Sequence, residues 1–379
     1  MIVNGHQDPR FDRLRERLEE NLASGEELGA AVAVDLDGQT VVDLWGGHAD
    51  VARTRPWERD TIVNVWSTTK EVTALAMLIL AERGLVDLDA PVATYWPDFA
   101  KNGKENVLVR HVMAHTSGVS GWEQPFVVED MYDWELSTSR LAEQAPWWEP
   151  GTASGYHAQN QGHLLGEIVR RVTGRSLKQF VAEEIAAPLG VDLQIGAKPE
   201  DDGRIAEIVP PPPLDIDLSQ VDFDSPMAKT FMGPVADASK ANTAEWRAAD
   251  MGALNGHTNA RALARTFSVI SRGGEIDGVR LLSQPTIDRI FEEQARGVDL
   301  VLGVPLRFGI GFGLPEPASL PYLPDDERVC FWGGWGGSLT VMFPDRRLTV
   351  SYVMNKMAPG IIGSERAAAY VNEILAAVE

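Results

Sequence analysis

The chain has a single cysteine, Cys330, and no long run of apolar residues. One cysteine excludes an internal disulfide and a thiolate metal cluster, and we expect Cys330 to be a buried spectator thiol. A membrane-spanning helix needs about 18 or more consecutive apolar residues. Charges occur throughout residues 1–20, where a signal peptide would have its apolar segment. These absences predict a cytoplasmic protein with no membrane partner.

Basic residues are also scarce. The 379 residues include 34 Lys and Arg against 55 Asp and Glu, which gives a formal net charge of -21. Binding to nucleic acid requires a basic patch, and no such patch is visible in this sequence. We therefore expect no nucleic-acid partner. The remaining composition, 44% hydrophobic and 23% charged, is that of a globular protein long enough for a large core.

Several catalytic and ligand-binding patterns are missing. There is no Gly-x-Ser-x-Gly, which argues against an α/β-hydrolase nucleophile elbow. Phosphate- and dinucleotide-binding glycine patterns are missing as well. His111 and His115 lie four apart on an expected helix, the spacing of a zinc pair, but no His-Glu-x-x-His and no third ligand can be identified. We favour a structural or loop-anchoring role for both, and we expect neither a metal nor an organic cofactor.

The elements that can be predicted lie in three blocks. In the first block, the periodicities indicate a helix over Phe11–Leu22 and strands over Ala30–Val34 and Thr40–Leu44. In the second block they indicate helices over Ser67–Arg83 (capped by Gly84), Val107–Ala114, Ser137–Ala145, Gln161–Val172, Ser176–Ala186 and Asn259–Arg272. In the third block they indicate strands over Leu306–Gly311, Ser338–Phe343 and Leu348–Val353 and a final helix over about Gly363–Val378. The four prolines at 210–213 indicate a loop.

Strands at both ends of the chain enclose a mainly helical middle. This order predicts an α/β (α+β) fold in which one antiparallel sheet is built from both chain ends and flanked by helices. We expect a single catalytic domain, with residues 1–66 and 267–379 as its α/β subdomain and residues 67–266 as an inserted, mainly helical subdomain. A ligand site is expected at their junction.

One Ser-x-x-Lys tetrad, Ser67 to Lys70, opens the apolar segment that reads as a buried helix. Side chains three apart lie on the same helical face, so the hydroxyl and the amine would be neighbours at the helix N-terminus. One turn can thereby hold a serine nucleophile and an amine base. The alternative is a serine N-cap followed by a solvated lysine.

Two further stretches could carry chemistry. Tyr156 follows the turn-rich residues 150–155 and is expected immediately before a helix, where its phenol could relay a proton in a cleft. The alternative is a tyrosine that only packs the loop. Residues 331–338 are rich in glycine and lead into a strand, as expected where a backbone must approach something closely. A bulged strand start would explain the same pattern.

In this order, the three stretches resemble the serine β-lactamase and penicillin-binding-protein superfamily, most closely the class C-like esterases called family VIII carboxylesterases. The likeness extends over nearly the whole chain and includes the His-Thr-Ser-Gly at 115–118. It implies a β-lactamase-like fold with Ser67 as the acylated nucleophile, Lys70 as its base or proton partner, and Tyr156 as general base or acid. It also implies an oxyanion hole formed by the backbone N–H groups of Ser67 and Trp335. Which of Lys70 and Tyr156 takes the first proton stays open.

The departures from the pattern point to the substrate. Where β-lactamases have Lys-Thr-Gly, this chain has Trp332, Gly333 and Gly334, and a neutral indole cannot hold an anionic group. Class C enzymes have an asparagine two residues after the tyrosine, where this chain has Ala158. Both changes favour neutral esters over β-lactams. An aromatic-walled acyl pocket is expected from the tryptophans in or beside the motifs, which are Trp122, Trp147, Trp148, Trp332 and Trp335.

The sequence thus predicts a serine hydrolase that cleaves small-molecule, neutral esters of short-to-medium acyl chains. A β-lactamase, D-alanyl peptidase or acyltransferase of the same fold is the first alternative. A catalytically silent binding module of the penicillin-recognition fold is the second, although a pure binder would not need Ser67, Lys70 and Tyr156 together. The chain could be a monomer or a homodimer.

Overall fold

A nine-stranded antiparallel sheet organises the fold. The computed structural model describes residues 2–213 and 221–379. The strand order is β1-β3-β2-β14-β13-β12-β11-β10-β9, and every neighbouring pair is antiparallel. The strands are β1 (Val3–Gln7), β2 (Gly29–Leu36), β3 (Gln39–Gly47), β9 (Ala295–Val298), β10 (Pro305–Phe308), β11 (Gly313–Leu314), β12 (Cys330–Gly333), β13 (Leu339–Phe343) and β14 (Leu348–Met354). The pairing of β2 with β14 joins the two chain ends, which confirms the predicted fold class.

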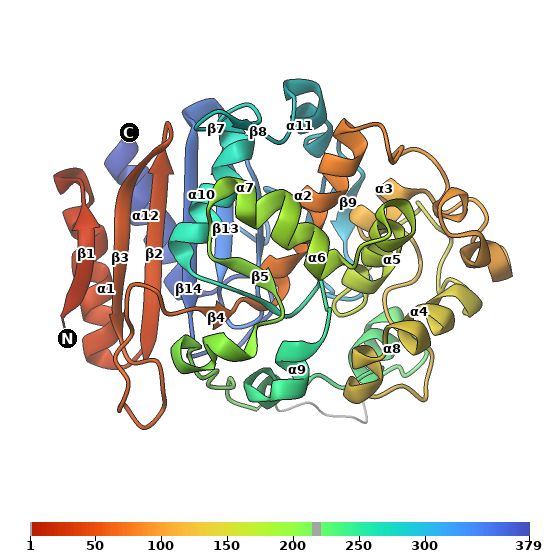
Figure 1. Ribbon diagram of the computed structural model, residues 1–379, viewed down its shortest axis with the longest axis horizontal. Helices are drawn as coiled ribbons and strands as arrows, with labels where there is room; N and C mark the ends of the chain where they lie inside the picture. Colours follow the sequence, from red (N-terminus) through yellow and green to blue (C-terminus); the bar gives the residue numbers. More distant parts are fainter. Residues whose placement is uncertain (1, 214–220) are drawn as a thin grey trace.

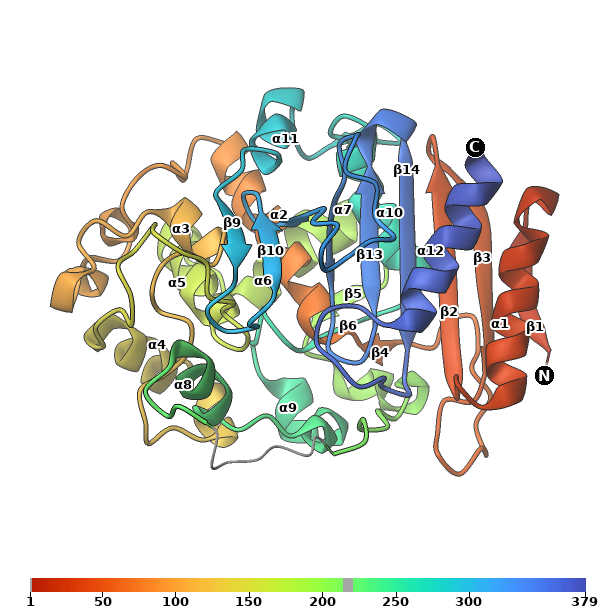
Figure 2. The same ribbon diagram turned by 180° about the vertical axis from the view of Figure 1, so that it is seen from behind.

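Helices cover both faces of this sheet. Figure 2 shows α1 (Asp12–Ser24) and the C-terminal α12 (Glu365–Val378) side by side over one face. On the opposite face, α10 (Ala260–Ser271) packs against β14, β2 and β13 (Figure 1). Along α1 the apolar residues Leu14, Leu18 and Leu22 are fully buried, as their spacing predicts.

The middle of the chain forms a second, mainly helical part beside the sheet (Figure 1). Its helices are α2 (Thr69–Glu82), α3 (Val109–Met113), α4 (Trp134–Glu143), α5 (Gln161–Thr173), α6 (Leu177–Val181), α7 (Ala187–Leu189), α8 (Pro226–Met232) and α9 (Ala244–Ala248). Short strands β4 (Val63–Asn64), β6 (Gly256–Thr258) and β5 (Leu193–Ile195) form a small sheet. Beyond α10 come the hairpin of β7 (Glu275–Ile276) and β8 (Val279–Arg280) and the helix α11 (Gln284–Ile290).

Helix α2 is the core element of the helical part. Every residue from Thr69 to Leu80 is buried, and the helix contacts α5, α6 and strand β12. A helix that is apolar on all sides must be enclosed by other elements. It ends at Glu82, with Arg83 as its C-cap, and Gly84 follows with φ 68°, as predicted from the glycine. Its N-terminal end therefore cannot shift without disturbing both parts of the molecule.

Several local predictions are wrong. Helix α5 begins at Gln161, so Tyr156 lies within an irregular segment and not immediately before a helix. Helix α3 ends at Met113, and His115 follows it with φ 63°, so His111 and His115 do not share a helical face. The α2 helix starts at Thr69, and Ser67 sits in a preceding 3₁₀ turn. Strands β1, β7, β8, β9, β11 and β12 and the small sheet were not predicted, because strands of two to five residues carry almost no periodicity.

Other expectations hold. The prolines at 210–213 lie in an irregular segment, and Cys330 is fully buried in β12, where burial raises the pKa of its thiol well above the ordinary value. Within the described ranges, none of the helices combines the length and the apolarity needed to cross a membrane.

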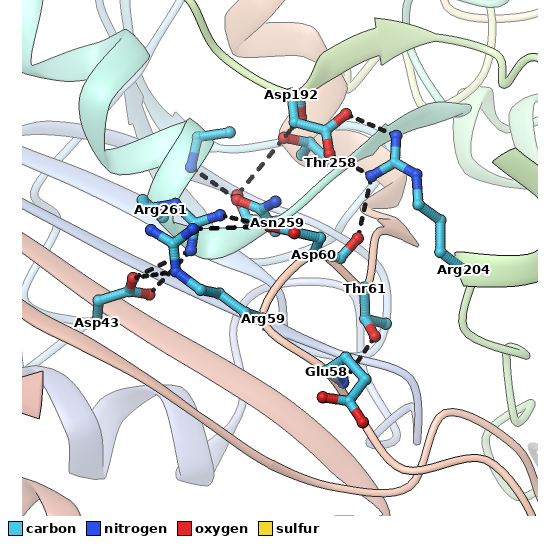
Figure 3. A network of polar contacts seen from close by, with 11 residues as sticks. Asp43, Glu58, Arg59, Asp60, Thr61, Asp192, Arg204, Thr258, Asn259 and Arg261 are labelled. Carbon is cyan, nitrogen blue, oxygen red and sulfur yellow. Dashed lines mark hydrogen bonds and ion pairs between the residues drawn. The ribbon is translucent and has the colours of Figure 1, made fainter. Parts of the chain in front are cut away.

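A polar network connects the sheet with the segment that leads to Ser67 (Figure 3). The buried carboxylate of Asp43 on β3 pairs with Arg261 at 3.0 Å and with Arg59 at 3.8 Å. Further along, Arg204 pairs with Asp192 and donates to the backbone oxygen of Asp60 at 3.0 Å. Residues 59–60 are thus held from two sides, three to four residues before strand β4 and close to the start of α10.

A buried carboxylate anchors the C-terminal helix. Glu27 is fully buried and pairs with Arg366 of α12 at 2.7 Å. It also accepts hydrogen bonds from the hydroxyls of Tyr352 on β14 and Tyr370 on α12. The partners of the Glu27 carboxylate therefore all come from the protein itself. If one of them is removed, the remaining buried polar groups lose a partner that water cannot replace.

Replacing this carboxylate should destabilise the fold. We expect Glu27→Ala to lower the free energy of unfolding by about 3–5 kcal/mol, because Arg366 would stay buried without its partner. Urea denaturation measures the change. Glu26→Ala is the matched control, since Glu26 is exposed and its loss should cost about 0.5 kcal/mol or less. Equal stabilities of the two variants would contradict the assigned role of Glu27.

Candidate active site

Ser67 lies in a strained turn at the N-terminal end of α2. Its neighbour Trp66 has φ 50°, a conformation that is unfavourable for a bulky residue. The ring of Trp66 is held in place by edge-on contacts with Trp246 and Trp335, with ring centroids 5.4 and 5.2 Å apart. Strain of this kind persists only where the surroundings enforce it, which is common at functional sites. The Ser67 side chain is 5% exposed.

Lys70 faces Ser67, as the spacing predicts. Its Nζ lies 3.0 Å from Ser67 Oγ and donates to the carbonyl oxygens of Ala158 at 2.7 Å and Ala253 at 3.0 Å. Among the described residues no carboxylate pairs with this amine, and burial lowers the pKa of Lys70 well below its ordinary value. A neutral amine has two N–H groups and one lone pair. The two carbonyls use the N–H groups, so the lone pair is left for the hydroxyl of Ser67.

Tyr156 completes the cluster of Ser67 and Lys70. Its ring lies 4.9 Å from Lys70 Nζ, and its hydroxyl accepts a hydrogen bond of 3.1 Å from the indole N–H of Trp332. Burial raises the pKa of the phenol, and hydrogen bonds to Ser67 and Trp332 offset only part of this rise. The phenol is therefore protonated at neutral pH. It can donate a proton to an oxygen bound near Ser67.

The glycine-rich turn after β12 is fastened to the segment before Ser67. Ser338 Oγ donates to the carbonyl of Val65 at 2.9 Å and lies 3.1 Å from the hydroxyl of Thr68. Within the turn, Gly334 N–H donates to Ser338 O at 2.7 Å. In the described part of the chain, the backbone N–H of Trp335 has no hydrogen-bond acceptor. The turn thus presents a free donor beside the Ser67 turn, as an oxyanion hole requires.

Of the glycines at 333 and 334, the second is required by close approach. A Cβ on Gly334 would lie 2.3 Å from both Val65 O and Ser338 Oγ. A Cβ on Gly333 would meet its nearest neighbour only at 3.0 Å. The glycine-rich pattern therefore reflects real backbone contact at one of the two positions.

The loop that carries Tyr156 is fixed by three consecutive backbone N–H groups. Gly155 N–H donates to His115 O at 2.9 Å, and His157 N–H donates to His115 Nδ1 at 3.0 Å. Between them, Tyr156 N–H donates to Oδ1 of the buried Asp299 at 3.0 Å. Because His115 comes from the loop after α3 and Asp299 follows β9, two remote segments set the position of the phenol.

These contacts involve residues that sequence reasoning either underrated or missed. The loop-anchoring role predicted for His115 is confirmed, and burial lowers the pKa of its imidazole so that it stays neutral and can accept from His157. Asp299 carries no motif signal and was not predicted. The carbonyl groups of Ala158 and Ala253 were missed for the same reason, since any residue type provides a carbonyl.

The tryptophans expected to wall an acyl pocket divide into two groups. Trp332 and Trp335 contact Tyr156 and Trp66. Trp122 instead stacks on Phe126 at 4.5 Å, and its indole N–H donates to Ser137 O, so it belongs to the core of the helical part. A tryptophan that fills the core and one that lines a cleft have the same sequence signal.

The comparisons with known proteins agree with this architecture. The family model described as Beta-lactamase matches residues 14–372. The chain belongs to the β-lactamase family. It is 36% identical over 376 residues to the Esterase/beta-lactamase LipL of Mycobacterium tuberculosis. The alignment covers 96% of this chain and 86% of that protein.

Solved structures give the same result. A family VIII carboxylesterase superposes with a TM-score of 0.92 at 36% identity, with both chains fully covered. A penicillin-binding protein homolog from Caulobacter crescentus has a TM-score of 0.91, also at 36% identity with full coverage of both chains. The resemblance inferred from the three motifs is thereby confirmed.

The hydrogen bonds of Asp299 generate a prediction. Its Oδ1 also accepts the N–H groups of Val301 and Leu302, each at 2.9 Å. We expect Asp299→Ala to lower kcat for p-nitrophenyl butyrate by about 10- to 100-fold, because three buried donors lose their acceptor and Tyr156 shifts. Asp299→Asn keeps an acceptor oxygen and should restore most of the activity.

The control for Asp299 is another loop-capping carboxylate. Asp50 is buried and accepts the N–H groups of Thr54 and Arg55, away from Tyr156. Asp50→Ala should lower the melting temperature and leave kcat unchanged. If Asp50→Ala and Asp299→Ala lose kcat in proportion to their loss of stability, Asp299 has no specific part in positioning Tyr156.

Proposed function

We propose that this protein hydrolyses neutral carboxylic esters of short-to-medium acyl chains through an acyl-enzyme on Ser67. The observation that carries the proposal is the neutral indole of Trp332, bonded to the Tyr156 hydroxyl at the place where the family's β-lactamases have a lysine. A lysine there would attract an anionic substrate. The buried indole provides one N–H donor and no charge, which suits an uncharged ester.

In the proposed mechanism, Lys70 takes the first proton. The Ser67 hydroxyl attacks the ester carbonyl carbon while its proton passes to the lone pair of the Lys70 amine, 3.0 Å away. The effect of burial favours Lys70 over Tyr156 as the first base. Burial disfavours the charged form of each group, and this leaves Lys70 as a neutral base but Tyr156 as a protonated acid.

The later steps use the remaining groups. The negative oxygen of the tetrahedral intermediate is assigned to the N–H groups of Ser67 and Trp335. Tyr156 gives its proton to the leaving alcohol and regains one from Lys70, which restores the neutral amine. A water molecule then attacks the acyl-enzyme with the same groups acting in reverse, and the acid and Ser67 are released.

Two observations weigh on the alternatives. A silent binding module gains nothing from a buried, unpaired amine 3.0 Å from a serine hydroxyl, since burying it costs stability. β-Lactam hydrolysis is favoured by the name of one relative, the Esterase/beta-lactamase LipL. A chromogenic cephalosporin therefore belongs in the test.

The first test combines substrates with a nucleophile variant. We expect turnover of p-nitrophenyl acetate, butyrate and octanoate, little or no turnover of the cephalosporin, and loss of ester turnover by more than about 1,000-fold in Ser67→Ala. Intact mass after a slow acylating inhibitor should give an adduct that Ser67→Ala lacks. Ser139→Ala, at an exposed serine, is the control. Rapid cephalosporin hydrolysis without ester turnover would replace the esterase proposal with a β-lactamase.

The second test concerns the protonation state of Lys70. Because the amine acts when deprotonated and its pKa is lowered, kcat/KM should fall as the pH drops through that lowered pKa and stay level above it. Lys70→Met should abolish turnover. Lys104→Met is the matched control, because Lys104 is equally buried among backbone carbonyls but lies away from Ser67. If a Lys70 variant keeps some activity and its kcat/KM falls at low pH just as in the wild type, Lys70 is not the group that titrates, and its assignment as the base is contradicted.

A further inference from the structure

A groove lies beside the strand that carries Trp332. It has a volume of about 560 Å³. Its walls come from the loop after β9, the loop between β11 and β12, the segment before α12 and the first residues of α12. They include Leu302, Ser319, Tyr322, Ile361, Ser364 and Glu365. Most of the wall side chains are apolar, and the only charged one, Glu365, is exposed to solvent.

The groove lies next to a wall of the candidate active site. A second cavity, of only about 10 Å³, shares Leu320, Tyr322, Ile361, Ile362 and Gly363 with the groove, and its other walls are Phe331, Trp332, Gly333 and Leu339. Trp332 thus takes part in the wall of this cavity while its indole N–H contacts the Tyr156 hydroxyl. Trp332 is therefore one contact between the walls of the groove and the catalytic cluster.

A second connection places the groove on the side of Tyr156. The N–H of Leu302, a wall residue, donates to Asp299 Oδ1 at 2.9 Å, and the same oxygen accepts the N–H of Tyr156 at 3.0 Å. In the proposed mechanism Tyr156 protonates the leaving alcohol. A substrate oriented for that step directs its alcohol portion, and not its acyl chain, toward Tyr156 and the groove.

The walls contain one polar group without a partner. The hydroxyl oxygen of Tyr322 is buried, and in the described residues nothing forms a hydrogen bond with it. Burial raises the pKa of Tyr322 to about 12, so the phenol keeps its proton and stays a donor. The other hydroxyls of the groove, on Ser319 and Ser364, are already bonded to the backbone. An unsatisfied buried donor calls for an acceptor from elsewhere.

We propose that this groove binds the alcohol portion of the substrate and selects uncharged esters of medium-chain alkyl and alkyl-ether alcohols, with the Tyr322 hydroxyl donating to the ether oxygen of the latter. The inference rests on the proposed ester hydrolysis and adds the substrate class to it. It also assigns Ile361 and Tyr322 as residues that determine specificity.

Acetate esters of methyl, butyl, hexyl and octyl alcohol test the groove directly. Each methylene buried in an apolar groove improves binding by up to about fourfold, so wild-type kcat/KM should rise by at least twofold per added methylene. Ile361→Trp, which fills the groove, should flatten this dependence. The matched control is Val51→Trp, at an aliphatic residue that is 54% exposed between β3 and β4. It should leave the dependence unchanged.

A series of p-nitrophenyl acyl esters, run on the same variants, decides which end of the substrate the groove holds. We expect Ile361→Trp to change all of them by one common factor. If it flattens the dependence on acyl length instead, the groove holds the acyl chain and the inference is overturned. If neither series changes, the groove is not part of the site. Absence of ester turnover in the wild type would refute the proposed function itself, which is a separate outcome.

The Tyr322 hydroxyl has its own test. Pentyl acetate and 2-ethoxyethyl acetate differ by one methylene replaced by an ether oxygen. Relative to Tyr322→Phe, the wild type should favour the ether by about fivefold, as one hydrogen bond to a buried donor allows. An identical preference in both proteins would overturn the role of this hydroxyl, and the melting temperature of Tyr322→Phe checks that the fold is retained.

Discussion

In the described part of the chain, the Lys70 amine is buried without a counter-ion, and this is the constraint on which the site depends. A charged ammonium would be strongly disfavoured in this environment, and two backbone carbonyls, of Ala158 and Ala253, accept hydrogen bonds from the neutral form. These carbonyls belong to two loops of the helical part, while the amine belongs to α2. The three segments must pack to within hydrogen-bond distance before Ser67 has a base at all, so folding and activation of the nucleophile are the same event.

A single amine in the site also gives the neighbouring groups separate roles. With Trp332 in place of a second cation, the hydrogen bonds to the Tyr156 oxygen offset only part of the effect of burial, and the pKa of the phenol is raised. The proposed mechanism therefore has one neutral base and one neutral acid, held 4.9 Å apart between Nζ and ring. Among the described residues, these groups offer no fixed charge to a substrate carboxylate. The same substitution that changes the proton chemistry thus also changes which substrates the cleft favours.

The precision of the site comes from groups outside the motifs. Asp299 and His115 hold the backbone of residues 155–157, and Ser338 joins the glycine-rich turn to Val65 and Thr68. In each case the hydrogen bonds join segments that are far apart in the sequence. The large sheet and the polar network around Asp43 keep these segments in register (Figure 3), so the catalytic groups are positioned by the whole fold and not by local loops.

The sequence alone determined the antiparallel sheet built from both ends, the buried α2 helix and the pairing of Ser67 with Lys70, because helical and strand periodicities and a three-residue spacing are local properties. It also revealed the family, since three motifs kept their order. Only the tertiary structure decided that Tyr156 lies in a loop held by Asp299, that two alanine carbonyls accept from Lys70, and that Trp332 reaches the Tyr156 hydroxyl. Backbone carbonyls leave no mark in a sequence, and contacts between residues more than a hundred positions apart have no period to detect.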